Sequence, residues 1–344
     1  MRLPDEYRNT IIHGEAVDGL EKLPDESVHC IITSPPYWNL RDYGDESQIG
    51  LETTPESYVR RLCDTLSASM RVLRNDGALW LNLGDTYATA KHGNDDPKYK
   101  QANTKTFRKR TPENCKPKDL VGIPWLVALE CRKRGWYLRR DIIWHKPNSF
   151  PESVHDRPHT AHEYIFMLTK SKKYYYDAIA VREGNHHLRS VWSVNIANFS
   201  RAHFATFPHD LIVPCVKAST SEHGVCAACG QPWQRVWENT DEFQSVRGKG
   251  YATYNETKEG VTKGRRSINA LKAKKLYKTT GWEPDCNCDA GTEPAVVLDM
   301  FMGAGTTAYI SKRLGRHYVG TELKHEYIDI ANERLNQIEL FNCK

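Results

Sequence analysis

The sequence predicts an α/β fold in which helices cover both faces of a mainly parallel, doubly wound sheet. Two observations support this prediction. Short apolar runs of strand length recur along the chain, and stretches with helical apolar spacing lie between them. Strands are expected at residues 10–13, 28–33, 78–83, 138–144, 163–169, 296–299 and 317–321. Helices are expected at residues 55–73, 123–134, 306–314 and 326–338.

The composition excludes several other classes of protein. The chain has 344 residues with 39% hydrophobic residues, which is enough for a sizeable core and argues against a disordered or collagen-like protein. Ten cysteines in a chain of this length are too sparse for a disulfide scaffold. No run approaches the roughly 18 apolar residues of a membrane span, and the first ten residues lack a secretory apolar segment. We therefore expect a cytoplasmic protein with no membrane partner.

Charge is unevenly distributed along the chain. The formal net charge is only +5, but residues 86–118 hold nine Lys/Arg against three Asp/Glu. Residues 231–280 hold eleven Lys/Arg against five Asp/Glu, so the remainder of the chain carries a net −7. Both stretches lack apolar periodicity and are expected to be loops or inserts. Two basic stretches on an otherwise acidic chain favour binding to a nucleic-acid backbone.

A strand, a glycine-rich turn and a helix follow one another near the C-terminus. Gly303 and Gly305 come after the strand at 296–299, and Glu322 ends the next strand. Glycines allow close approach of a ligand, the helix N-terminus offers free N–H groups, and the acid can accept from ribose hydroxyls. The pattern indicates a nucleoside-cofactor site. It also fits the dinucleotide fingerprint of a nicotinamide-dependent oxidoreductase, but only 22 residues follow Glu322, so the other strands are expected upstream, as in a circularly permuted sheet.

The segment Ser34-Pro35-Pro36-Tyr37 directly follows the apolar strand at 28–33. Two prolines force the chain out of the sheet at the strand's carboxyl end, where α/β proteins bind ligands. The segment offers a hydroxyl, a carbonyl and an aromatic face. Ser34 Oγ and the Pro35 carbonyl could accept from the exocyclic amine of a base, while Tyr37 stacks on a base taken out of the duplex.

These two motifs together resemble the β-group of S-adenosyl-L-methionine-dependent DNA amino-methyltransferases. The tetrapeptide at 34–37 precedes the cofactor motif at 299–307, in the order of that group. Other matching segments are Gly14-Glu15, Asp141-Ile-Ile-Trp144-x-Lys146-Pro147 and His203-Phe-Ala-Thr-Phe207-Pro208, and the resemblance covers roughly residues 10–215 and 294–340. It implies a Rossmann-like methyltransferase sheet, circularly permuted, and DNA as the macromolecular partner.

The resemblance also implies roles for individual residues. Ser34, Pro35, Pro36 and Tyr37 would form the catalytic tetrapeptide. The cofactor's methionine and ribose side would be lined by Asp299, Phe301, Gly303, Gly305, Thr306 and Thr307, with Glu322 accepting from the ribose hydroxyls. Phe207 and Pro208 would close the methionine end. Glu15 stands near the adenine, where the family usually has aspartate.

The expected reaction is direct transfer of the methyl group, with no covalent enzyme intermediate. Serine at position 34 favours N4 of cytosine over N6 of adenine within the resemblance, and adenine remains the alternative. The sequence leaves open whether the chain forms a homodimer and whether a cognate restriction endonuclease accompanies it.

Four of the ten cysteines form two close pairs. Cys226 and Cys229 flank two alanines, and Cys286 and Cys288 follow after a long separation. Four thiolates in two pairs suit tetrahedral Zn²⁺ and leave no open position for catalysis, so a structural zinc site is expected. The alternative is four free cysteines on an insert. A non-enzymatic zinc-ribbon DNA-binding protein is disfavoured because the insert is a minority of the chain.

The motifs divide the chain into three parts. Residues 1–215 would form the catalytic part, including the basic loop at 86–118. Residues 216–293 would be a basic insert with the four-cysteine site, and residues 294–344 would complete the cofactor-binding part.

Overall fold

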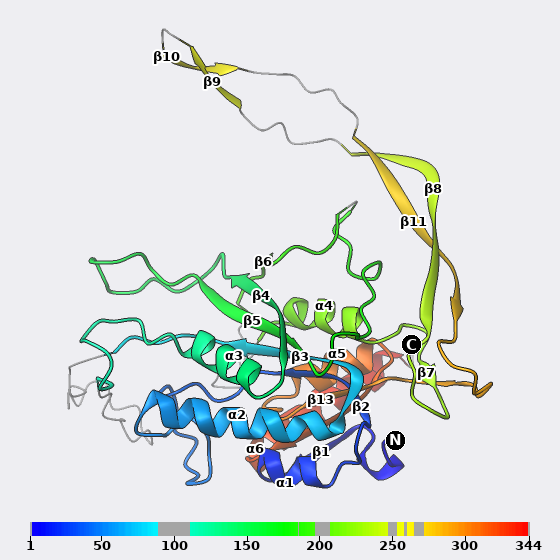
Figure 1. Ribbon diagram of the computed structural model, residues 1–344, viewed down its shortest axis with the longest axis horizontal. Helices are drawn as coiled ribbons and strands as arrows, with labels where there is room; N and C mark the ends of the chain where they lie inside the picture. The colour runs from blue at the N-terminus through cyan, green and yellow to red at the C-terminus, as the bar shows by residue number, and fades with distance from the viewer. Residues whose placement is uncertain are drawn as a thin grey trace.

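The computed structural model describes residues 2–88, 111–184, 186–196, 207–246, 253–257, 260–264 and 272–342. Within these residues, helices lie on both faces of an eight-stranded sheet, and a separate two-stranded ribbon extends away from it (Figure 1). The predicted α/β fold class is confirmed.

The sheet is parallel except for one strand among those described. Its order is β1 (Thr10–His13), β14 (His317–Glu322), β13 (Val296–Asp299), β2 (Val28–Thr33), β3 (Leu73–Leu83), β5 (His162–Thr169), β4 (Tyr137–His145) and β6 (Val191–Ser193). β5 runs antiparallel to both β3 and β4, and every other neighbouring pair is parallel. The two C-terminal strands lie between β1 and β2, which is the permuted arrangement expected from the motif order.

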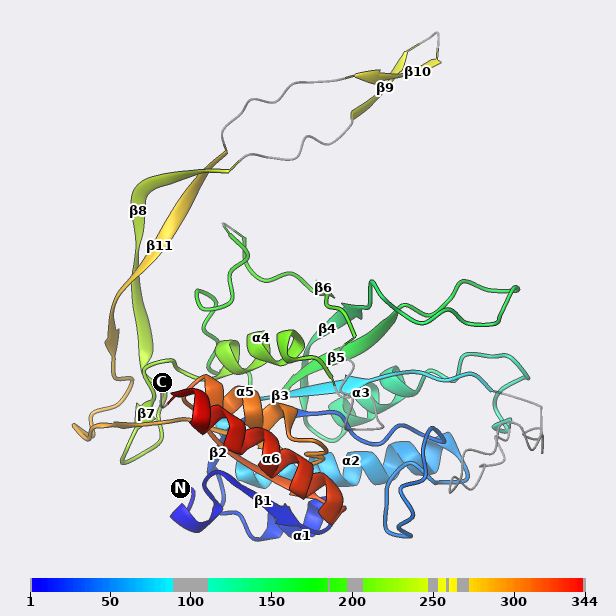
Figure 2. The same cartoon turned by 180° about the vertical axis from the view of Figure 1, so that it is seen from behind.

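Two layers of helices cover the two faces of this sheet. One layer holds α1 (Ala16–Glu21), α2 (Pro55–Val72) and α3 (Ile123–Lys133), which lie towards the viewer in Figure 1. The other holds α4 (His209–Ser219), α5 (Thr306–Arg313) and α6 (His325–Asn342), which come forward in Figure 2.

Successive residues of the central strands pack into opposite layers. Ile31 and Leu79 belong to the core under α2 and α3, whereas Cys30 and Trp80 belong to the core under α4. This alternation follows from the two-residue period of a strand. It explains why the central strands are apolar on both faces, as is usual for a buried parallel sheet.

Local sequence signals account for where the main helices begin. Thr54 caps α2 by accepting a hydrogen bond from the Ser57 N–H at 3.1 Å, and Pro55 occupies the first turn. α5 begins directly after Gly305, whose φ of 77° lies in the left-handed region. The chain can therefore turn sharply from the strand into the helix.

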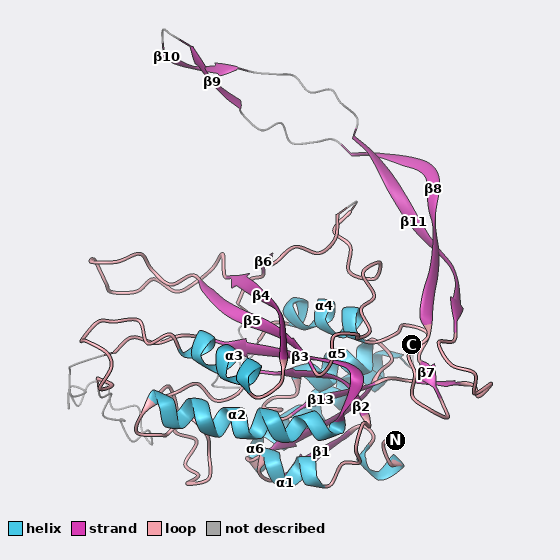
Figure 3. Ribbon diagram, in the orientation of Figure 1, coloured by secondary structure: helices cyan, strands magenta, loops and turns pink. Residues whose placement is uncertain are grey.

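The expectation of a loop at residues 231–280 is wrong, because most of the described residues there form strands. β8 (Gln234–Val246) and β11 (Lys272–Glu283) pair as an antiparallel ribbon, magenta in Figure 3. Polar strands are stable here because each satisfies the other's backbone hydrogen bonds, a non-local effect that apolar periodicity does not reveal. β9 (Thr253–Thr257) pairs with β10 (Gly260–Gly264) further out, and β7 (Val225–Cys226) pairs with β12 (Thr292–Glu293) at the base.

Other differences from the predicted elements are small. β3 begins at Leu73, five residues before the expected start, because it follows α2 without a loop. α4 and β6 were not expected from the sequence. Most of the basic stretch at 86–118 lies outside the described residues. No described helix combines the length and apolar character needed to cross a membrane.

Candidate active site

The two predicted motifs meet at one edge of the sheet. Ser34 follows the end of β2, the turn at 300–305 follows β13, and Glu322 is the last residue of β14. Because these strands are parallel and adjacent, their carboxyl ends share an edge, which is where doubly wound sheets bind ligands. A cavity of about 530 Å³ lies there. Its lining includes Glu15, Ser34, Pro35, Pro36, Tyr37, Phe207, Phe301, Gly303, Thr306 and Glu322.

The carboxylate of Glu322 is held by the backbone of the neighbouring turns. Its Oε2 accepts from the Gly303 N–H at 2.7 Å and its Oε1 from the Lys324 N–H at 2.8 Å. Burial raises the pKa of Glu322 above its usual range. A carboxylate oxygen can accept more than one hydrogen bond, so this side chain can still take the hydroxyls of a bound ribose.

The two glycines of the turn have different surroundings. A Cβ on Gly303 would meet only the Phe301 carbonyl, at 4.0 Å, so the space beside it is open. A Cβ on Gly305 would lie 2.7 Å from Ala331 Cβ on α6. Gly303 therefore leaves room on the cavity side, and Gly305 allows α5 and α6 to pack closely.

Asp299 lies behind the cavity wall instead of lining it. Only 1% of its surface is exposed. Its Oδ1 accepts from Thr33 Oγ1 at 2.7 Å and from the Phe301 N–H at 3.1 Å, while its Oδ2 accepts from Thr307 Oγ1 at 2.7 Å. Burial raises the pKa of Asp299 from 3.8 to about 6. Through these hydrogen bonds the carboxyl links β2, β13 and α5 beneath the turn at 300–305. Thr307 is also buried and does not line the cavity.

In the tetrapeptide, the hydroxyl of Tyr37 takes part in several hydrogen bonds. It donates to Glu163 Oε2 at 2.8 Å and lies 3.2 Å from Asn82 Oδ1, while Ser34 Oγ approaches it at 3.5 Å. Burial, followed by the charge of Glu163, raises the pKa of Tyr37 well above its usual range, so it remains a neutral phenol. Gly84 lies against the ring, since a Cβ there would be 2.8 Å from Tyr37 Cε2.

Sequence reasoning missed a polar group beside Tyr37 that also lines the cavity. Glu163 on β5 also accepts from Asn82 Nδ2 at 3.1 Å and pairs with Lys146, whose ammonium lies 4.4 Å from the Trp144 ring centroid. These side chains meet because β5 is antiparallel and starts at the edge where β3 ends. The sequence signals were Trp144-x-Lys146 within the resemblance and a charged residue, Glu163, at the start of an otherwise apolar strand.

Of the remaining predicted cofactor residues, Glu15 and Phe207 line the cavity and Pro208 does not. Glu15 directly precedes α1, and Pro208 is the residue before α4. The preceding segment, which contains the quoted His203, lies outside the described residues.

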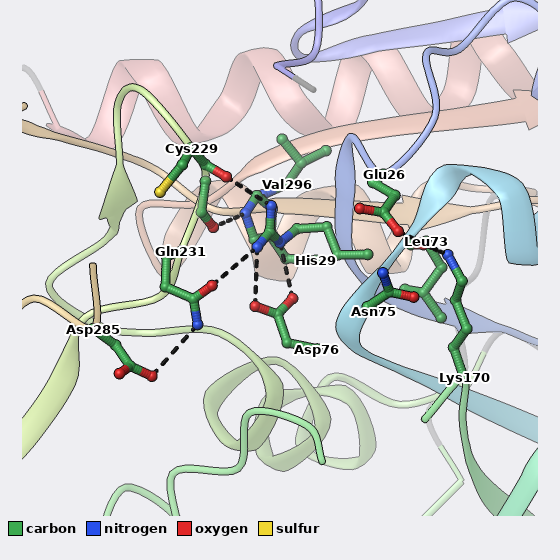
Figure 4. A network of polar contacts seen from close by, with 12 residues as sticks. Glu26, His29, Leu73, Asn75, Asp76, Lys170, Cys229, Gln231, Asp285 and Val296 are labelled. Atoms are coloured by element: carbon green, nitrogen blue, oxygen red, sulfur yellow. Dashed lines mark hydrogen bonds and ion pairs between the residues drawn. The ribbon is translucent and has the colours of Figure 1, made fainter. Parts of the chain in front are cut away.

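The four paired cysteines come together as the sequence predicts. One ligand atom from each of Cys226, Cys229, Cys286 and Cys288 lies within 4.8 Å of the others. The turn at residues 226–230, which carries the first cysteine pair, contacts His29 near the amino end of β2 (Figure 4). It also accepts a hydrogen bond from Arg74, near the amino end of β3. The cluster is therefore separated from the cavity by the length of these strands, roughly 15–25 Å at about 3.3 Å per residue.

Comparison with known proteins gives consistent matches. The model of an N6/N4 DNA methylase family matches residues 28–227 and 289–333. The chain is 41% identical over 332 residues to the Type II methyltransferase M.Cfr9I of Citrobacter freundii, an alignment that covers 95% of this chain and 87% of the relative.

Two solved structures have a similar fold. The PvuII DNA methyltransferase, described as cytosine-N4-specific, superposes with a TM-score of 0.58 at 15% identity, covering 94% of this chain and 85% of the other. A putative DNA modification methylase from Thermus thermophilus, complexed with S-adenosyl-L-methionine, gives a TM-score of 0.51 at 20% identity, with 95% and 93% coverage.

Proposed function

The chain belongs to the N6/N4 DNA methylase family, whose members use S-adenosyl-L-methionine to methylate amino groups of DNA bases, and we propose that its target atom is N4 of cytosine. Membership of this family excludes the two alternatives raised by the sequence, a nicotinamide oxidoreductase and a non-enzymatic zinc-ribbon protein.

The observation that supports methyl transfer to an amine is a single cavity shared by the tetrapeptide and the glycine turn at 300–305. Ser34, Pro35 and Tyr37 line it from the side of β2, and Gly303, Thr306 and Glu322 line it from the side of β13 and β14. Its volume falls within the range of about 300–1,000 Å³ that is typical of ligand pockets. An amine held by the first group would therefore lie close to a cofactor held by the second.

The residues present fit S-adenosyl-L-methionine. Glu322 offers partly buried carboxylate oxygens for the ribose hydroxyls, and Gly303 leaves open space beside the turn. We assign Glu15 to the adenine end and Phe207 to the methionine end. Asp299, Gly305 and Thr307 would act by shaping this site from behind. The bound cofactor supplies an electrophilic methyl group on a sulfonium that is a good leaving group.

Ser34 and Pro35 would prepare the amine for attack. The lone pair of an exocyclic amine is delocalised into the ring, so acceptors on its N–H bonds favour a pyramidal, more nucleophilic nitrogen. Ser34 Oγ and the Pro35 carbonyl are the acceptors in this proposal. Held by these two acceptors, the amine nitrogen would take the methyl group that the cofactor supplies and would then release one proton to water.

Tyr37 would hold the flipped base by contact with its ring. Its hydroxyl is fixed by Glu163 and Asn82, so the ring keeps one orientation in the absence of DNA. Lys146 pairs with Glu163 and neutralises the charge of this partly buried carboxylate. The three side chains are positioning residues for Tyr37.

The serine at position 34 favours cytosine, and N6 of adenine is the close alternative because the family includes both targets. We also propose that the basic stretches contact DNA phosphates. Relatives named Type II methyltransferases support the further proposal that a restriction endonuclease of matching specificity accompanies the chain. Formation of a homodimer stays a prediction.

The target atom is tested by measuring methyl transfer to DNA that carries no methylated bases. The protein is incubated with isotopically labelled cofactor, and the DNA is digested to nucleosides and analysed by mass spectrometry. Label in N4-methylcytosine is expected. Label in N6-methyladenine alone would refute the cytosine assignment, and label in neither nucleoside would refute the amino-methyltransferase activity.

Ser34→Ala tests the role of the serine hydroxyl. We expect a loss of about tenfold or more in the rate of methyl transfer, with the cofactor dissociation constant nearly unchanged, because the proposed role of the hydroxyl is to hold the amine and not the cofactor. Ser67→Ala on α2, outside the cavity lining, is the matched control and should behave as the wild type. Loss of cofactor binding in Ser34→Ala would show that the residue serves the other half of the cavity.

A further inference from the structure

Four thiols from two distant segments converge at the base of the β8–β11 ribbon. Cys226 ends β7 and Cys229 follows in the adjoining turn, whereas Cys286 and Cys288 come just after β11. Their sulfur atoms lie within 4.8 Å of one another. In a tetrahedral zinc–thiolate centre with Zn–S bonds of about 2.3 Å, neighbouring sulfurs are about 3.8 Å apart. Side-chain adjustments of about 1 Å or less would therefore complete that geometry.

The chemistry of the cluster favours zinc over the alternatives. All four ligand atoms are thiol sulfurs and all four cysteines are free, so no disulfide occupies the site. Soft thiolate ligands in a tetrahedral arrangement select zinc among the common divalent metals. Four protein ligands leave no position for water or substrate, so the centre would be structural.

The turn that carries the first pair is attached to the central sheet by polar contacts (Figure 4). Arg74 Nη1 on β3 donates to the Cys229 carbonyl at 2.9 Å, and its other nitrogens form a bidentate pair with Asp76 at 2.8 and 3.0 Å. His29 Nδ1 on β2 accepts from the Val296 N–H at 3.1 Å, so its Nε2 carries the proton and donates to the Gly230 carbonyl at 3.0 Å.

Gly230 is required for this attachment. Its φ of 73° lies in the left-handed region, and a Cβ there would be 2.7 Å from Arg74 Nη1. On the other side of the turn, Gln231 Nε2 lies 3.5 Å from Asp285 Oδ2, directly before the second cysteine pair. β7 and β12 pair across the same base, with Thr292 opposite Cys226.

We propose that Cys226, Cys229, Cys286 and Cys288 bind one structural zinc ion, and that this centre fastens the β8–β11 ribbon to the edge of the sheet opposite the cavity. Without the metal, the segment after β11 is held by the short β7–β12 pair and a few exposed contacts. With the metal, both ends of the ribbon are tied to the turn that Arg74 and His29 hold. The ribbon then leaves the sheet in one defined direction (Figure 1).

Metal analysis of the full chain, purified under reducing conditions, tests the site directly. We expect about one zinc per chain, and X-ray absorption should show four sulfur neighbours at about 2.3 Å. Folded wild-type protein with less than about half an equivalent of zinc, or with iron in its place, would overturn the proposal. This measurement needs no variant, so it is independent of any folding defect.

A cysteine double variant assigns the ligands. Cys286→Ser combined with Cys288→Ser removes one pair from partly exposed positions, and we expect the bound zinc to fall below about a tenth of an equivalent. Cys115→Ser, a partly buried cysteine outside the cluster, should retain the metal. Full zinc content in the double variant would overturn the ligand assignment.

Hydrogen exchange before and after chelation tests the fastening role. Removing zinc should accelerate amide exchange about tenfold or more in β7, β12 and the sheet-proximal ends of β8 and β11, and leave β2 and β3 protected. The cofactor dissociation constant should be unchanged, because the centre lies at the other end of the strands. Unchanged exchange in the ribbon would overturn this role. None of these readouts depends on methyl transfer, so they are separate from the test of the proposed function.

Discussion

Replacing Asp299 by asparagine should remove a defined part of the pH dependence of stability. The Asp299 carboxyl is 1% exposed, and burial raises its pKa from 3.8 to about 6. Between these two values the folded chain keeps the proton that the unfolded chain has released. The stability contribution of this group is therefore fully present below pH 3.8 and is lost as the pH rises through about 6.

The size of the effect follows from the shift. A pKa difference of about two units corresponds to about 3 kcal/mol of unfolding free energy, lost between strongly acidic and neutral pH. About 1.4 kcal/mol of this falls between pH 5 and pH 7.5, where the protein can be studied conveniently. Asparagine keeps the shape of the side chain, and its carbonyl can accept from Thr33 and Phe301 as the carboxylate does. Its amide can face Thr307, whose hydroxyl lies 3.5 Å from the Ile32 carbonyl and can donate there.

The assay is urea unfolding at a series of pH values between 5 and 7.5, without cofactor. The free energy of unfolding of Asp299→Asn, minus that of the wild type, should increase by about 1.4 kcal/mol across this range. Asp18→Asn, an exposed aspartate on α1, should follow the wild-type pH dependence and controls for the loss of a charge. A difference that stays flat, or that falls as the pH rises, would refute the assignment of a raised pKa to Asp299.

Two further predictions concern the cavity wall. Glu163→Gln should lower the single-turnover rate of methyl transfer by about tenfold, because the Tyr37 hydroxyl loses its charged acceptor. The cofactor affinity of this variant, measured by calorimetry, should equal that of the wild type. A methyl-transfer rate equal to that of the wild type would contradict the positioning role of Glu163. Gly305→Ala should lower the free energy of unfolding by about 1–3 kcal/mol, because its Cβ would clash with Ala331 in a left-handed backbone. Gly303→Ala has no such clash, so it should be less destabilised yet bind cofactor more weakly; equal stability of the two variants would contradict this reasoning.

The sequence was sufficient for the features that depend on neighbouring residues. The strands at 10–13, 28–33 and 296–299 have the predicted boundaries, because short apolar runs and flanking prolines or glycines are local signals. The order of the two motifs was enough to predict the permuted sheet. The CxxC and CxC pairs were also visible as candidates for one centre.

Features that depend on non-local pairing were not predictable in the same way. The β8–β11 ribbon has a polar sequence typical of a loop, and each strand exists because the other satisfies its backbone. Glu163 lies beside Tyr37 because β5 runs antiparallel to β3. The sequence assigned Asp299 to the cofactor surface, whereas the fold buries it beneath that surface.

The sequence alone thus indicated several of the chemical groups that line the cavity: the Ser34 hydroxyl, the tyrosine ring at position 37, the glycine turn and the Glu322 carboxylate. The tertiary structure decided which of the predicted groups line the cavity and which support it. Thr33 and Asp299 are 266 residues apart in the chain and share a hydrogen bond of 2.7 Å. Side-chain periodicity is set within a few residues along the chain, whereas burial and pKa depend on which strands become neighbours, and that is settled only when the whole sheet packs.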